Sequence, residues 1–283
     1  MATILVTGGN IGNQVAEELA QLGFAVRVLT KTVKQNPMWD KLKIEQIAVD
    51  MASIPSMLPA FEGVDRFFSV TPFVENLAEL GLNTIEAAKQ AGVRRIVRSS
   101  FIGASETGIT LGRDHRTIEK AVEASGIQYT ILRPNIFMQS YAMNAESIRR
   151  DSAFYMPQGS GRVSLIDVGD VSSVAVAVLM QDGHENRVYK LTGPEALSND
   201  DVAERLSRVI GKKVTYIDVT EKQAEQSMAS EGLPTWMIKS LLELFDFSKR
   251  GAAELISTDS EYLLNRKPIS FDIFVRGNAK LFQ

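Results

Sequence analysis

The sequence predicts an α/β protein with a Rossmann-type, doubly wound parallel sheet and a smaller, mostly helical C-terminal lobe. Three observations lead to this. Short β-rich runs alternate with helix-length amphipathic segments from the start of the chain, which is typical of right-handed β-α-β units. A glycine-rich stretch, TGGNIG, lies between the first such run and the first helical segment. The alternation fades near the middle of the 283 residues, where the smaller lobe begins.

The first helix is predicted from the spacing of its apolar residues. Val15, Leu19 and Leu22 recur at intervals of four and three within residues 13–23, so they share one helix face, and Gly23 ends the helix. Five strands are expected, one before this helix and four after it, and another helix is expected between the fourth and fifth strands. The expected strands cover 2–7, 24–30, 43–50, 64–71 and 93–100, and that helix covers 75–92.

The doubly wound unit closes with one more helix and strand. A helix is expected from Arg113 to Ser125, because Gly126 follows it, and a buried strand from Ile127 to Leu132, because Pro134 breaks the run. Beyond this point the pattern loosens. It contains a Met- and aromatic-rich stretch over 136–156, a Gly/Ser turn over 158–162, an apolar run over 164–180, and strands near 188–193 and 214–219.

These patterns divide the chain into two parts. We expect a nucleotide-binding domain over 1–135, to which 163–192 return. The smaller lobe is expected over 136–162 and 193–283, and it would bind the substrate.

Composition excludes several classes of function. The 31 basic and 34 acidic residues are spread along the chain and give a net charge of −3, so neither nucleic acid nor an anionic membrane is expected as a partner. The absence of cysteine removes disulfides and thiolate chemistry, and with only two histidines no metal site is expected. There is no basic leader and no apolar run of about 18 residues. A soluble, cytoplasmic protein is expected.

Gly8, Gly9 and Gly12 occupy the turn between the first strand and the first helix, where a dinucleotide fingerprint would lie. Glycine there lets the backbone approach a diphosphate, and the helix N-terminus offers free N–H groups. The spacing is G-G-x-x-G rather than G-x-G-x-x-G, and the alternative is a tight turn without a ligand. The surrounding elements favour nucleotide binding by Gly8, Gly9, Asn10, Ile11 and Gly12.

The segment VTGGNIGNQVAEELAQLGFAVRVLTK resembles the start of NmrA-like proteins, an atypical branch of the short-chain dehydrogenase/reductase superfamily. The likeness continues through VDRFFSVTP, AAKQAGVRRIVRSS, IEKAVEASGIQYTILRPNIFMQ and SLIDVGDVSSVAVAVL to VYKLTG. Family members usually carry G-x-x-G-x-x-G; Gly9 to Gly12 matches its second half, and two residues are missing after Gly8. The resemblance implies NAD(P) binding, and we expect the shortened loop to weaken it.

The end of the second strand bears on the choice of cofactor. NAD-specific folds place an acid there, but this strand ends in Thr30 and Lys31, with Lys34 close behind. A hydroxyl and cations suit a 2′-phosphate, so NADP(H) is favoured over NAD(H); the alternative is that these lysines are simply solvated. Topology and resemblance add further cofactor positions at strand ends: Asp50, Met51, Thr71, Pro72, Ser99, Phe101, Pro134, Asn135 and Phe137.

His115 is the candidate catalytic residue. The Tyr-x-x-x-Lys pair that is usual in the superfamily does not occur in the chain. His115 starts a helix where isoflavone-reductase-like relatives carry lysine and the triphenylmethane and quinone reductases that this chain resembles carry histidine. An ordinary pKa near 6.5 would suit proton donation at neutral pH. The alternative is a surface histidine without a task, and His184 is expected to be structural or solvent-exposed.

The resemblance and the aromatic content together suggest a function. We expect an NADPH-dependent reductase that transfers hydride to an aromatic or conjugated small molecule of quinone, azo or related type. The alternative is a non-catalytic NAD(P)-sensing regulator that acts through a protein partner. A homodimer is left open. Residues that could line a pocket for a flat acceptor, or else belong to the core, are Met138, Tyr141, Phe154, Tyr155 and Trp236.

Overall fold

The computed structural model describes residues 3–283, and these form two compact units. Each unit is described by itself. Unit 1 contains the described residues up to Glu106 together with Gly112–Arg133 and Gly169–Tyr189. Unit 2 contains Thr107–Leu111, Pro134–Val168 and Lys190–Gln283.

A seven-stranded sheet forms the centre of unit 1, with the order β3-β2-β1-β4-β5-β6-β8. All pairs from β3 to β6 are parallel. The chain therefore winds outward in two directions from β1 and β4, which confirms the predicted doubly wound fold. The strands are β1 (Thr3–Thr7), β2 (Ala25–Thr30), β3 (Glu45–Ala48), β4 (Val64–Ser69), β5 (Arg95–Ser99), β6 (Gln128–Pro134) and β8 (Arg187–Leu191).

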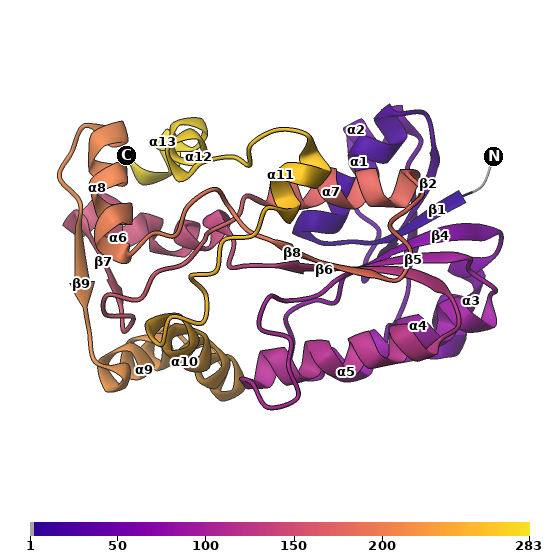
Figure 1. Ribbon diagram of the computed structural model, residues 1–283, viewed down its shortest axis with the longest axis horizontal. Coiled ribbons are helices and arrows are strands. Elements are labelled where there is room, and N and C mark those ends of the chain that lie inside the picture. Colours follow the sequence, from indigo (N-terminus) through magenta and orange to yellow (C-terminus); the bar gives the residue numbers. More distant parts are fainter. Residues whose placement is uncertain (1–2) are drawn as a thin grey trace. The chain divides into compact units, whose positions relative to one another are not determined.

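Helices cover both faces of this sheet (Figure 1). On one face, α1 (Asn10–Gln21) lies beside α7 (Val168–Met180), and the Ser172 hydroxyl donates to the Ile11 carbonyl over 3.4 Å. On the other face, α4 (Leu77–Gln90) packs on α5 (Thr110–Ala124) so closely that a Cβ at Gly81 would lie 2.2 Å from Ile118 Cδ1. The buried middles of the strands, such as Leu5, Phe67 and Ile96, form the core between these layers.

Two short helices of unit 1 were not predicted. They are α2 (Pro37–Leu42) and α3 (Ile54–Phe61), and each carries a proline in its first turn, where a missing N–H costs nothing. The indole N–H of Trp39 in α2 donates to Glu17 Oε1 over 2.7 Å and fixes α2 against α1. Both helices are too short to show a clear periodicity, and α3 also contains Pro59 in its interior.

Unit 2 contains a small parallel pair, β7 (Ala153–Met156) and β9 (Thr215–Asp218). The predicted strand at 214–219 corresponds to β9, but its partner β7 was not predicted. The core of this unit contains Phe154, Phe271 and Phe282, all fully buried. Its helices are the 3₁₀-helix η1 (Met138–Asn144), α6 (Ala145–Asp151), α8 (Asn199–Ile210), α9 (Glu221–Ser230), α10 (Thr235–Lys249), α11 (Asp259–Leu264), α12 (Phe271–Gly277) and α13 (Ala279–Phe282).

Over residues 3–283, none of the helices combines the length and the apolar character that crossing a membrane requires.

Candidate cofactor and active site

The turn between β1 and α1 consists of only Gly8 and Gly9. The Gly8 N–H donates to the Leu29 carbonyl of β2 over 2.8 Å, and a Cβ at Gly8 would lie 2.9 Å from that oxygen. Gly9 has φ +124°, a conformation that L side chains rarely adopt. Both positions therefore require glycine for reasons of backbone geometry, and the chain enters the helix at once.

The amino end of α1 lies tight against the end of β1. A Cβ at Gly12 would lie 1.8 Å from the Thr7 carbonyl oxygen, so only glycine permits this approach. The first i→i−4 bond of the helix runs from the Asn13 N–H to the Gly9 carbonyl over 2.8 Å. The N–H groups of the three preceding residues have no such partner inside the helix, and together with the helix dipole they favour an anion.

Asn13 occupies part of this corner. Its Oδ1 accepts the Gly9 N–H over 3.1 Å. One donor of the shortened loop is thus already satisfied by the chain itself. Sequence reasoning did not single out Asn13, although its place one residue after the third glycine, on the first turn of α1, was a usable signal.

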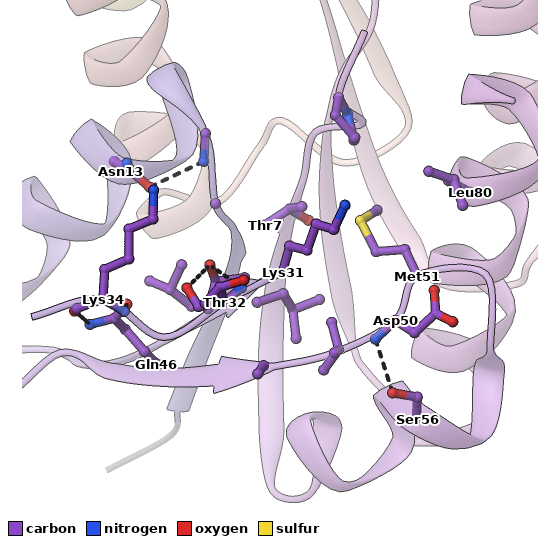
Figure 2. A pocket seen from close by; sticks show the side chains of 18 of the residues that line it. Thr7, Asn13, Lys31, Thr32, Lys34, Gln46, Asp50, Met51, Ser56 and Leu80 are labelled. Carbon is purple, nitrogen blue, oxygen red and sulfur yellow. Dashed lines mark hydrogen bonds between the residues drawn. The ribbon is translucent and has the colours of Figure 1, made fainter. Parts of the chain in front are cut away.

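A cavity of about 1090 Å³ opens beside this turn, at the carboxyl ends of β1 to β4 (Figure 2). Such a volume accommodates a nucleotide-sized ligand. Eight of the predicted cofactor residues line it: Gly8, Gly9, Thr30, Lys31, Lys34, Asp50, Met51 and Pro72. Polar and aromatic lining residues that were not predicted include Thr7, Asn13, Thr32, Gln35, Asn36, Trp39, Gln46, Ser56 and Asn76.

The two predicted lysines lie in this cavity. The ammonium groups of Lys31 and Lys34 form no ion pair with a residue in the described part of the chain. Figure 2 shows the side chain of Lys34 extending toward Asn13. Thr30 also lines the cavity, and its hydroxyl donates to the Thr32 carbonyl over 3.0 Å in the loop after β2.

Thr7 provides an independent sign of a ligand. Its hydroxyl is buried beside the cavity and has no hydrogen-bond partner among residues 3–283. An orphaned buried hydroxyl is costly, and a ligand oxygen would satisfy it. The close glycine turn, the orphaned hydroxyl and the unpaired lysines fit a dinucleotide.

The remaining predicted cofactor residues do not line this cavity. Ile11 and Gly12 are buried under the turn, and Asn10 is exposed at the start of α1. Thr71, Ser99 and Phe101 are buried near the ends of β4 and β5. Pro134, Asn135 and Phe137 belong to unit 2.

Asn135 has partners of its own. Its Nδ2 donates to Ser164 Oγ over 2.7 Å and to the Ala253 carbonyl over 2.8 Å. These bonds give this amide a structural role within unit 2.

His115 differs from the expected surface histidine. It lies on α5 with 8% of its surface exposed, and its Nδ1 is 3.4 Å from Nη2 of Arg98. Burial and the neighbouring guanidinium hold the pKa of His115 well below its usual range. The expectation of an ordinary pKa is therefore wrong, and this imidazole is neutral at neutral pH.

A buried charge cluster lies on the same helix. Glu119 is fully buried and accepts from Ser100 Oγ over 2.6 Å and from Nε and Nη2 of Arg133 over 2.8 and 2.6 Å. Arg116 adds a third donor group at 3.1 Å. Burial would raise the pKa of Glu119, but the bonds from Arg133 and Ser100 outweigh it and lower that pKa.

The aromatic residues expected to line a substrate pocket separate into two groups. Met138, Tyr141 and Phe154 belong to the core of unit 2, where the Tyr141 hydroxyl donates to Asn199 Oδ1 over 2.6 Å. Their burial is that of packing residues and does not support a substrate contact. Tyr155 is 43% exposed and Trp236 is partly exposed.

His184 has a structural contact. His184 is buried, and its Nδ1 lies 2.9 Å from the Tyr189 hydroxyl, so its contact is structural. Across the described part of the chain, no group of three or more His, Cys, Asp or Glu side chains could hold a metal ion.

Known proteins resemble this chain over nearly its whole length. The sequence profile of the NmrA-like family matches residues 1–264. An NAD(P)H azoreductase of Xenophilus azovorans is 36% identical over 282 residues, which is 99% of each chain.

Two solved structures share the fold. The NADPH complex of an Escherichia coli quinone oxidoreductase has a TM-score of 0.86 and 25% identity, over 99% of this chain and 100% of that one. A triphenylmethane reductase of Citrobacter has a TM-score of 0.88 and 25% identity, over 98% and 99%.

Proposed function

The chain belongs to the NmrA-like family and is an oxidoreductase, and on this premise we propose that it is an NADPH-dependent reductase of azo, quinone or related conjugated aromatic acceptors. The relatives named above carry azoreductase, quinone oxidoreductase and triphenylmethane reductase activities in their names. Their acceptors share a flat conjugated system that takes up a hydride. This shared chemistry supports the acceptor class.

The observation that carries the proposal is the composition of the cavity beside the glycine turn. Among its lining residues the only carboxylate is Asp50, which follows β3, whereas Lys31 and Lys34 follow β2. An acid after β2 would bind the free ribose hydroxyls of NAD, and cations there would bind a 2′-phosphate. The unpaired lysines therefore favour NADP(H) over NAD(H).

The chain's residues have distinct tasks in this proposal. We propose that the Thr7 hydroxyl and the glycine turn before α1 contact the diphosphate, that Lys31 and Lys34 bind the 2′-phosphate, and that Asp50 and Met51 border the adenine. NADPH, when bound, supplies the hydride. We propose His115 as the residue that contacts the acceptor.

Kinetics with both coenzymes test the assignment. Oxidation of NADPH and of NADH is measured with a panel of quinones and azo dyes. At equal low concentrations of the two coenzymes, turnover with NADPH is expected to be faster than with NADH. Lys31→Ala and Lys34→Ala should each raise the KM for NADPH about tenfold, since a charged hydrogen bond contributes about 1.5 kcal/mol, with little effect on NADH. Lys41→Ala is the matched control, because this exposed lysine of α2 does not line the cavity.

Two outcomes contradict the proposal. Tight coenzyme binding without turnover across the panel favours the sensing regulator. The absence of any thermal shift with NADP or NAD contradicts the cofactor assignment, because a ligand at 100 times its Kd should add about 2.7 kcal/mol of stability.

A further inference from the structure

Arg98 is an unusual residue for a sheet interior. It lies on β5, is fully buried, and has no carboxylate within ion-pair distance among residues 3–283. Its Nη1 donates to Thr71 Oγ1 over 2.7 Å and to Ser69 Oγ over 3.2 Å, and its Nε has no partner. A buried guanidinium with an orphaned donor opposes folding, so its presence calls for a functional explanation.

The partners of Arg98 connect the cofactor cavity with His115. Ser69 ends β4, and Thr71 immediately precedes Pro72, which lines the cavity. The second guanidinium nitrogen, Nη2, lies 3.4 Å from Nδ1 of His115 on α5. One buried side chain thus bridges the strand end beside the cavity and the candidate catalytic residue.

This contact determines which imidazole nitrogen carries the proton. A guanidinium has only donors, so Nδ1 of His115 must accept, and the proton of the neutral ring must lie on Nε2. Nε2 makes no hydrogen bond to a residue in the described part of the chain. The N–H of His115 is therefore available to a ligand.

The charges around this pair favour a negative ligand group. Glu119 is the carboxylate that acts on Arg98 electrostatically, and it is already bonded by Arg133 and Arg116. The Phe101 ring packs beside the imidazole with its centroid 6.3 Å away. Among the described residues, the charge that acts on His115 is therefore that of Arg98, and an aromatic ring lies beside the imidazole.

We propose that Arg98 is a positioning residue that holds His115 as the neutral Nε2–H tautomer, so that this N–H donates a hydrogen bond to the negative charge that forms on the acceptor. The proposal rests on the proposed reductase function. Hydride brings two electrons and one proton to one acceptor atom, and the nicotinamide is oxidised. A conjugated oxygen or nitrogen of the acceptor then carries the negative charge and takes its proton from water, while His115 keeps its own.

The electrostatics of the pair agree with this role. Burial and the charge of Arg98 lower the pKa of His115, so an imidazolium is not the resting form. Burial also lowers the pKa of Arg98, to about 9, which leaves it charged at neutral pH. A fixed N–H aimed at a developing anion needs no reorganisation during the reaction.

Imidazole NMR tests the tautomer without any coenzyme or acceptor. The chain has only two histidines, and a His184→Gln variant assigns their signals. We expect ¹⁵N spectra to show His115 protonated at Nε2 only, with no titration between pH 6 and 8. In Arg98→Met the single tautomer should be lost and the titration should move up toward pH 6.5. Arg95→Met, on the same strand, should leave the His115 signals unchanged.

Kinetics provide the second readout. His115→Ala should lower kcat about 100-fold, as removal of one preorganised donor does. Arg98→Met should lower it about tenfold with the KM for NADPH within twofold, and Arg98→Lys should recover part of the loss. The kcat of the wild type should be flat from pH 6 to 8, whereas a protonated histidine donor would give a rate that falls as pH rises.

Several results would overturn the inference. They are a wild-type His115 that titrates near pH 6.5, one that carries its proton on Nδ1, or an Arg98→Met variant with unchanged tautomer and kcat. If Arg98→Met does not fold, the wild-type spectrum and Arg98→Lys still decide the matter. A panel without turnover removes the proposed function but leaves the tautomer result standing, so the two failures are distinguishable.

Discussion

The two ends of strand β5 each carry a buried arginine, and their surroundings differ. At the amino end, Arg95 donates to Asp182 Oδ1 and Glu185 Oε1 over 2.7 and 2.6 Å and to the Gln181 carbonyl over 2.7 Å. At the carboxyl end, Arg98 has hydroxyl and imidazole partners and an unpartnered Nε. Among the described residues, Arg95 forms ion pairs and Arg98 forms none.

The difference separates a structural charge from a functional one. Arg95 ties the end of α7 to the sheet through bonds to the Gln181 carbonyl and to the carboxylates of Asp182 and Glu185. Arg98 lies at the edge where parallel sheets bind their ligands, and its positive charge is balanced only at longer range by Glu119. A buried cation with an unpartnered donor at this edge can stabilise a bound anion, or a negative charge that forms during a reaction.

The largest test of this comparison removes the carboxylate that balances the cluster. Glu119→Gln keeps the shape of the side chain but leaves Arg133, Arg116 and Arg98 without their buried anion. We expect the free energy of unfolding to fall by about 3–5 kcal/mol in urea denaturation at pH 7.5. Glu123→Gln is the control, because that carboxylate also pairs with Arg116 but is partly exposed, and its loss should cost about 1 kcal/mol or less. If both substitutions lower the free energy of unfolding equally, Glu119 does not stabilise the buried arginines.

A second test compares the two arginines directly. Arg95→Met should lower the free energy of unfolding by about 2–3 kcal/mol, since several charged hydrogen bonds are lost at the end of α7. Arg98→Met should lower the free energy of unfolding by about 1 kcal/mol or less, or should raise it, because an apolar side chain suits that interior. Urea denaturation of both variants measures the contrast. A larger loss at Arg98 than at Arg95 would contradict a functional explanation of its burial.

The smallest test uses pH. Because the pKa of folded His115 lies below the unfolded value of about 6.5, the unfolded chain binds more protons as pH falls through that value. The stabilisation is complete above about pH 6.5 and is lost below it, with a slope of up to about 1.4 kcal/mol per pH unit. The lowered pKa of Glu119 acts only below about pH 4.3. Denaturation between pH 7 and 5 should show the slope in wild type and in His184→Gln but not in His115→Gln.

Much of the fold could be predicted from local patterns. Alternating apolar runs and helical spacing identified the sheet from β1 to β6, because parallel strands buried on both faces leave a continuous apolar signal. The helices α2 and α3 and the strand β7 escaped, because their stability depends on contacts with distant segments, such as the pairing of β7 with β9. Short elements carry too little periodicity to be recognised alone.

The candidate site was predictable only in part. The glycine turn and the strand-end lysines follow from sequence position, and they do line the cavity. Gln46 and Trp39 come from elements whose side-chain direction depends on packing, and they were missed. The burial of His115 could not be predicted, because the residues next to it at the start of the helix are charged. Arg98, however, was visible as an arginine directly after the apolar Ile96 and Val97, within a strand expected in the sheet.

The bond between Asn13 and the Gly9 N–H has a consequence for how coenzyme affinity is distributed. A diphosphate that takes this N–H exchanges one hydrogen bond for another, so this one donor contributes little net attraction. Under the proposed function, the charges of Lys31 and Lys34 then supply a larger share of the affinity. Attraction between exposed charges is screened over about 8 Å in physiological salt. Rising ionic strength should therefore raise the Kd of the coenzyme, so that its affinity depends on the salt concentration as well as on the fold.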